Sequence, residues 1–91
     1  MPKRANLVLK ADPGASWIEV HVASATGRQL FQGTLEPGQT QRFRARKLWL
    51  NVGQPGSLTW KLNGKLRSAP GTDASFFIVT ARGISPAPAS A

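Results

Sequence analysis

Residues that could carry acid, base or nucleophilic chemistry are sparse in this 91-residue chain. The sole histidine, His21, lies between two valines, and the nearest carboxylate in the sequence is that of Glu19. Catalysis by histidine needs an oriented nucleophile and usually a carboxylate partner, and no local motif here supplies such a set. We expect Glu19 and His21 to share a strand face as a solvated pair, and we predict that the protein is not an enzyme.

Metal and cofactor chemistry has little to build on in this sequence. The chain contains no cysteine, and Asp12, Glu36 and Asp73 are scattered along it. A metal site needs several ligands close together, and one histidine with distant carboxylates is a poor supply. No glycine-rich segment matches a phosphate-binding loop. We therefore expect no metal site, no cofactor and no catalytic residue.

The strongest local departure from average composition is the basic run at residues 42–47. On a strand, Arg42, Arg44 and Arg46 point to one side and Phe43 to the other, which spaces the guanidiniums by about 6.5 to 7 Å. Such a row suits a polyanion, because each guanidinium is a planar bidentate donor. The other interpretation is a solvated outer face that keeps a sheet edge from aggregating.

Three tryptophans are candidates for an aromatic contact surface. Trp60 shares the parity of its apolar neighbours, so we assign it to the core. Trp49 and Trp17 are out of phase with the apolar residues of their strands, which would place Trp49 near the arginines if the two strands adjoin. Each is either exposed for stacking or covered by another part of the chain. The predicted contact residues are Arg42, Arg44, Arg46, Lys47 and Trp49.

The elements that must position these residues are predicted to be strands. Apolar and polar residues alternate, and glycine or proline interrupts the chain too often for an amphipathic helix. Pro37-Gly38 suits a type II turn, and Asn63-Gly64 suits a type I′ hairpin turn. We predict an all-β fold, a small antiparallel β-sandwich of about seven to eight short strands. The predicted strands cover residues 6–11, 15–23, 28–35, 40–45, 48–52, 58–62, 65–67 and 76–82.

One domain with a modest core is expected from a chain of this length. We predict an N-terminal tail at residues 1–5, the sandwich at 6–83, a loop at 68–73 and a disordered Pro/Ala/Ser tail at 84–91. No segment approaches the roughly 20 apolar residues of a transmembrane helix, and no apolar signal-peptide core follows the basic start. The chain is then either cytoplasmic as given or a piece of a larger anchored protein.

Net charge points to acidic partners. The chain has 12 Lys and Arg residues against 4 Asp and Glu residues, which gives a formal charge of +8. Nucleic acid, anionic lipid headgroups and anionic cell-wall polymers all suit such a balance. Small basic domains without a polyanion partner are also common, so charge does not choose among these possibilities.

Turn and aromatic residues recur in a recognisable order. The series is Ser16-Trp17, Gly27, Gly33, Pro37-Gly38, Phe43, Leu48-Trp49-Leu50, Gly53 and Asn63-Gly64. Over about residues 7–82 this order resembles the C-terminal domain of RodZ-type bacterial cell-shape proteins. Two features depart from that pattern: the family often has Gly-Asn-Ala where this chain has Gly53-Gln54-Pro55, and it is usually less basic than residues 42–47.

The resemblance implies a compact β-sandwich-like domain without a catalytic role, outside the cytoplasmic membrane. In that family the domain follows a cytoplasmic helix-turn-helix domain that contacts the actin-like MreB, a transmembrane helix and a linker. We therefore expect an interaction domain in cell-wall morphogenesis that binds wall-synthesis proteins or anionic wall polymers through its basic strand face. The alternative from another class is a stand-alone basic β-domain that binds nucleic acid, since a fold can be reused.

Overall fold

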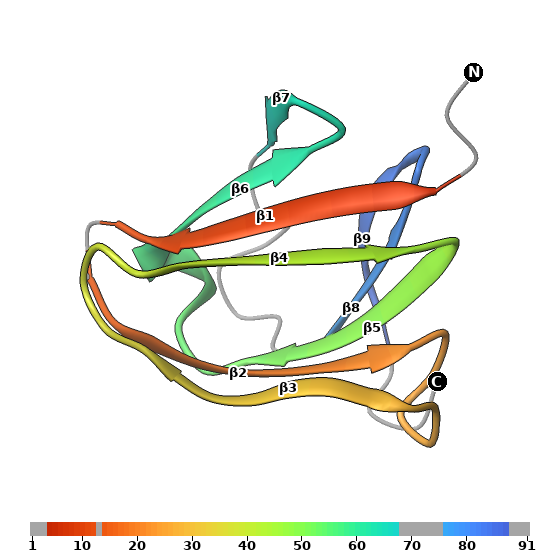
Figure 1. Cartoon of the computed structure of the whole chain (residues 1–91), viewed down its shortest axis with the longest axis horizontal. Helices are drawn as coiled ribbons and strands as arrows, with labels where there is room; N and C mark the ends of the chain where they lie inside the picture. Colours follow the sequence, from red (N-terminus) through yellow and green to blue (C-terminus); the bar gives the residue numbers. More distant parts are fainter. Residues whose placement is uncertain (1–3, 13, 68–75, 88–91) are drawn as a thin grey trace.

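Two antiparallel sheets packed face to face make up the computed structural model, which describes residues 4–12, 14–67 and 76–87 (Figure 1). Within these residues there are nine strands and one short 3-10 turn. The predicted all-β sandwich is therefore confirmed. No segment in the described part of the chain forms a helix with the length and apolar character needed to cross a membrane.

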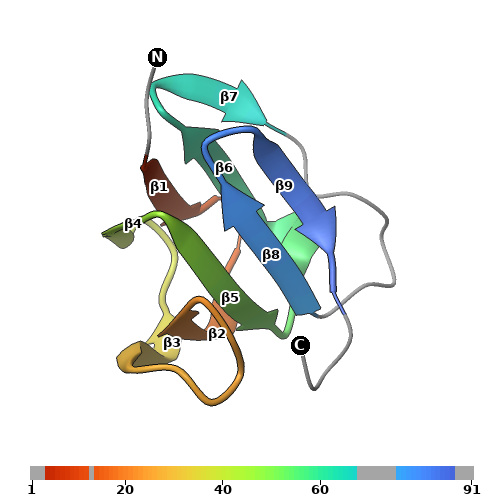
Figure 2. The ribbon, with the colours of Figure 1, turned by 90° about the vertical axis from the view of Figure 1, so that its right-hand side faces the viewer.

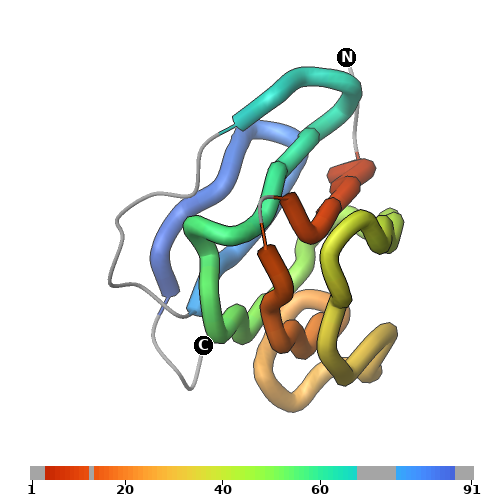
Figure 3. The backbone as a smooth tube through the Cα atoms, turned by 90° about the vertical axis from the view of Figure 1, so that its left-hand side faces the viewer, coloured from red at the N-terminus to blue at the C-terminus, as the bar shows by residue number. Residues whose placement is uncertain are grey.

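Sheet A, the upper layer in Figure 1, has the strand order β4-β1-β6-β7. Its strands are β1 (Ala5–Ala11), β4 (Thr40–Ala45), β6 (Leu58–Leu62) and β7 (Lys65–Arg67). Figure 3 shows β1 between β4 and β6, which are far from it in the sequence. Because β1 is central, the outward side chains of β4, β1 and β6 form one continuous surface.

Sheet B has the strand order β3-β2-β5-β8-β9. Its strands are β2 (Ser16–Val22), β3 (Gln29–Leu35), β5 (Lys47–Val52), β8 (Phe76–Thr80) and β9 (Gly83–Pro86), and Figure 2 shows β5, β8 and β9 side by side. The chain returns from sheet B to sheet A through the 3-10 turn η1 (Pro55–Ser57). Strands β4 and β5 follow each other in the sequence but belong to different sheets.

The core lies between the two sheets and follows from the two-residue alternation of each strand. Trp60 is buried at 1% exposure, and its ring meets that of Phe77 edge-on at 5.2 Å. The indole Nε1–H of Trp60 donates to the carbonyl of Pro55 at 3.2 Å, so its polar atom is satisfied. The assignment of Trp60 to the core is confirmed. Further buried residues are Leu7, Leu9, Ile18, Val20, Leu35, Phe43, Leu48, Leu50, Val52, Leu62 and Val79.

Both predicted turns are confirmed. Gly38 has a φ of 89°, and the amide of Gln39 donates to the carbonyl of Glu36 at 2.9 Å, as a type II turn requires. Asn63 and Gly64 have φ values of 52° and 83°, the two positive values of a type I′ turn.

The C-terminal strand β9 corrects the prediction of a disordered tail at residues 84–91. It pairs with β8 in the register Thr80↔Gly83 to Phe77↔Pro86. The loop between the two strands, Ala81 and Arg82, lacks the Asn-Gly or Gly-rich signal of a tight hairpin, so the sequence pattern does not reveal it. The predictions for residues 1–3, 68–75 and 88–91 lie outside the described residues.

Candidate anion-binding face

Arg42 and Arg44 lie exposed on the outer face of sheet A. Phe43 between them is buried at 6% exposure, so strand alternation directs both arginines away from the core. Their register partners on β1 are Val8 for Arg42 and Asn6 for Arg44. The prediction that these two arginines share one face opposite Phe43 is confirmed.

Two lysines that the sequence reasoning missed lie on the same face. Val8 pairs with Arg42 on one side and with Lys61 on the other, so these three residues form a row across sheet A. Lys10, two residues further along β1, pairs with Thr40 of β4 and is exposed. Parity within each strand would have predicted the outward direction. It could not show that β1 joins β4 to β6, because that pairing is between distant segments.

The basic face, defined as Lys10, Arg42, Arg44 and Lys61, is not neutralised within the described residues. In that part of the chain, the one ion pair joins His21 and Glu19 in sheet B. Cations gathered on one surface without ion-pair partners produce a positive potential that is partly screened by salt. The arrangement can therefore attract and hold an anionic surface or polymer.

The other predicted contact residues do not join this face. Arg46 lies exposed at the bend between β4 and β5, and Lys47 begins β5 in sheet B. Lys47 and Trp49 share the outer side of sheet B, because Trp49 pairs with His21 of β2 and Lys47 has the same parity. Of the five residues predicted as one surface, two thus lie in sheet A, two in sheet B and Arg46 at the bend between them. Trp49 was expected near the arginines only if the two strands adjoined, and that condition is not met, because β4 and β5 belong to different sheets.

Trp49 is covered rather than available for stacking. Its exposure is 3%, and its ring lies 5.4 Å from that of His21, edge-on, and 5.6 Å from that of Phe76. Its Nε1–H is buried without a hydrogen-bond partner among the described residues. Trp17, on the same side of sheet B, is half-buried. An aromatic platform beside the arginines is therefore not part of the candidate site.

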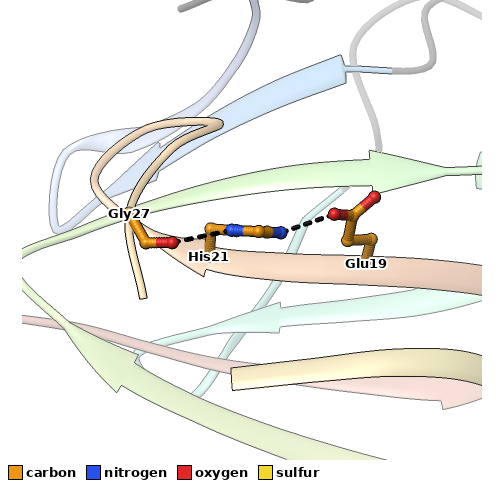
Figure 4. Close-up of polar contacts among 3 residues, drawn as sticks. All are labelled: Glu19, His21 and Gly27. Atoms are coloured by element: carbon orange, nitrogen blue, oxygen red, sulfur yellow. Dashed lines mark hydrogen bonds and ion pairs between the residues drawn. The ribbon is translucent and has the colours of Figure 1, made fainter. Parts of the chain in front are cut away.

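Glu19 and His21 form the expected pair, but its histidine is more buried than a solvated pair would be (Figure 4). His21 Nε2 lies 2.5 Å from Glu19 Oε2, and Nδ1 lies 2.8 Å from the carbonyl oxygen of Gly27. Each ring nitrogen therefore lies within hydrogen-bonding distance of an oxygen, which holds the imidazole from both sides. Among the residues described, no three His, Asp or Glu side chains gather as a metal site would require.

Comparisons with known proteins place the chain in a family. No curated protein and no solved structure matches the chain. The family model of the RodZ C-terminal domain matches residues 8–75, which include both strands of the basic run and the hairpin at Asn63-Gly64. The match covers well over half of the sequence. The chain therefore belongs to the RodZ C-terminal domain family, a family of non-enzymatic domains from cell-shape proteins.

Proposed function

We propose that this chain is a non-catalytic interaction domain of a cell-shape protein, and that its basic face holds an anionic partner outside the cytoplasmic membrane. Wall-synthesis proteins with acidic surfaces and anionic wall polymers are the partners that fit. The observation that carries the proposal is the gathering of Lys10, Arg42, Arg44 and Lys61 on one sheet face, with no ion-pair partner in the described residues. Charge complementarity of this kind speeds encounter and selects acidic surfaces.

The interior of the protein supports a non-catalytic role. His21 is the residue most suited to proton transfer, and its two ring nitrogens are taken by Glu19 and by the backbone of Gly27. A general base must reach the proton that it removes, and this geometry leaves His21 as a link between β2 and the following loop.

Charge reversal on β4 tests the proposal. The variant R42E/R44E should be retained on a polyphosphate resin at least about tenfold more weakly than the unaltered chain, because each reversed charge replaces attraction by repulsion. The matched control is R28E/R82E, which changes net charge equally at two exposed positions of the sheet B half. Its retention should stay close to that of the unaltered chain.

Circular dichroism of both variants would verify that the fold is retained, since all four side chains are exposed. Equal losses in the two double variants would mean that net charge alone drives retention, and the assigned face would be rejected. Retention on duplex DNA that exceeds retention on polyphosphate at matched salt would favour nucleic acid as the partner instead.

A further inference from the structure

Leu66 of β7 is the large apolar side chain that stands out on the surface. It is 69% exposed, and within the described residues it has no equal among the large hydrophobic side chains. It pairs with Lys61 across the β6–β7 hairpin and so lies on the outer side of sheet A. An isolated exposed leucine is common in itself, so its neighbours decide whether it has meaning.

Those neighbours place Leu66 at the end of a row that includes the basic face. In register, the row runs Arg42, Val8, Lys61 and Leu66 across all four strands of sheet A. Apolar and cationic side chains therefore alternate from one edge of the sheet to the other. Val8 is half-buried, while the other three are exposed.

A groove of about 350 Å³ follows this outer face. Val8 and Leu66 supply its apolar lining, Lys10 and Lys61 supply positive charge, and Thr59 adds a hydroxyl. Thr40 also lines it, and Asp12 is the one carboxylate among its lining residues. The groove therefore combines apolar contacts with two cations.

This combination distinguishes between two kinds of anionic partner. A soluble polyanion needs the cations and gains nothing from an exposed leucine, which it would leave in water or in contact with charge. An anionic bilayer uses both features, since its headgroups attract lysine and arginine while its interfacial region accepts apolar side chains. Charge complementarity and the exposed leucine together therefore favour a lipid surface.

We propose that the outer face of sheet A docks on an anionic lipid bilayer, with the headgroups against the basic face and Leu66 inserted at the interface. The inference rests on the proposed function, in that it uses the same cations as the contact surface. It goes beyond that function by naming a lipid surface as the partner and Leu66 as a contact residue. The β6–β7 hairpin is then the element that enters the membrane interface.

The test is co-sedimentation of the full chain with vesicles made of equal parts phosphatidylglycerol and phosphatidylcholine, beside vesicles of phosphatidylcholine alone. The unaltered chain should bind the anionic vesicles and stay free of the neutral ones. Leu66→Gln should lower binding to anionic vesicles about tenfold, because the apolar contact is lost while charge is unchanged. Leu66→Met is the matched control and should bind like the unaltered chain.

Polyphosphate binding, measured on the same variants, separates the two proposals. Leu66→Gln should leave polyphosphate binding unchanged, whereas R42E/R44E should weaken binding to both polyphosphate and vesicles.

If Leu66→Gln bound anionic vesicles as tightly as the unaltered chain, the lipid inference would be overturned and the proposed function would stand. Absence of vesicle binding, with polyphosphate binding still dependent on the two arginines, would likewise overturn the lipid inference alone. If R42E/R44E changed neither, both proposals would fail.

Discussion

His21 shows how one polar residue can be held in a buried position on the outer side of sheet B. Its Nε2 meets the Glu19 carboxylate and its Nδ1 meets the Gly27 carbonyl, while the ring edge packs on Trp49. The residue therefore connects β2, the β2–β3 loop and the aromatic cluster of sheet B.

Removal of the ring nitrogens should destabilise the fold. His21→Phe keeps an aromatic edge against Trp49 but leaves the Gly27 carbonyl and the Glu19 carboxylate without this donor, at an expected cost of about 1–3 kcal/mol in the free energy of unfolding. Glu19→Gln should cost less, because Glu19 is partly exposed and the amide can still accept a hydrogen bond. Urea denaturation measures both.

The double variant E19Q/H21F provides the control for this interaction. Because both single changes act on the same contact, Glu19→Gln by weakening it and His21→Phe by removing it, the double variant should cost less than the sum of the two, with a coupling of about 0.5 kcal/mol or more. Strict additivity, or a His21→Phe protein as stable as the unaltered chain, would contradict the assigned role.

At the scale of elements, the β2–β3 connection depends on close backbone approach at Gly27. The amide of Gly27 donates to the carbonyl of Ser24 at 2.9 Å, and the amide of Val22 donates to the carbonyl of Arg28 at 2.9 Å. A Cβ atom on Gly27 would lie 1.7 Å from the carbonyl oxygen of Val22, which is fixed backbone. The loop that presents an acceptor to His21 is thus compatible with glycine alone.

Gly27→Ala should therefore lower the free energy of unfolding by at least about 2 kcal/mol, since the clash forces the loop away from the end of β2. Gly56→Ala, in η1, is the matched control, because no atom lies within 4 Å of its added Cβ. It should change stability by less than about 0.5 kcal/mol. Chemical denaturation of the two variants gives the comparison, and similar stabilities would show that the loop adapts.

Alternation along the chain predicted the strands and the side of each residue, but not which strands would be neighbours. Parity assigned Trp60 to the core and directed Phe43 away from the arginines, both correctly, because burial on one face has a period of two. The same parity placed Trp49 opposite its apolar neighbours, also correctly. It could not reveal that the chain changes sheets at Arg46, since a one-residue bend leaves no compositional mark.

Only two of the four residues of the basic face were predictable from the sequence, because strand neighbours cannot be predicted from alternation alone. Arg42 and Arg44 belong to a local basic run, which is visible in the sequence itself. Lys10 and Lys61 reach the same face through the pairing of β1 with β4 and β6, which joins segments some tens of residues apart. Strand β9 was missed because its hairpin loop lacks the usual turn residues.

The whole molecule presents two outer faces of different character. Sheet A carries the basic face and exposed Leu66, whereas sheet B carries Trp49, Trp17 and the Glu19–His21 pair. The formal charge of +8 is unevenly distributed, because the cations of β4, β1 and β6 lie on one side of one sheet. The chain belongs to a family of domains from cell-shape proteins.

Nuclear magnetic resonance mapping of the backbone amides during titration with polyphosphate is the most direct measurement of which face meets an anion. We expect the largest shift changes to cluster in β4, at Lys10 and Val8 of β1, and at Lys61 of β6. The amides around His21 and Trp49 should change little. Changes centred on β2, β5 and β8, or spread evenly over all exposed cations, would contradict the assignment of sheet A as the contact surface.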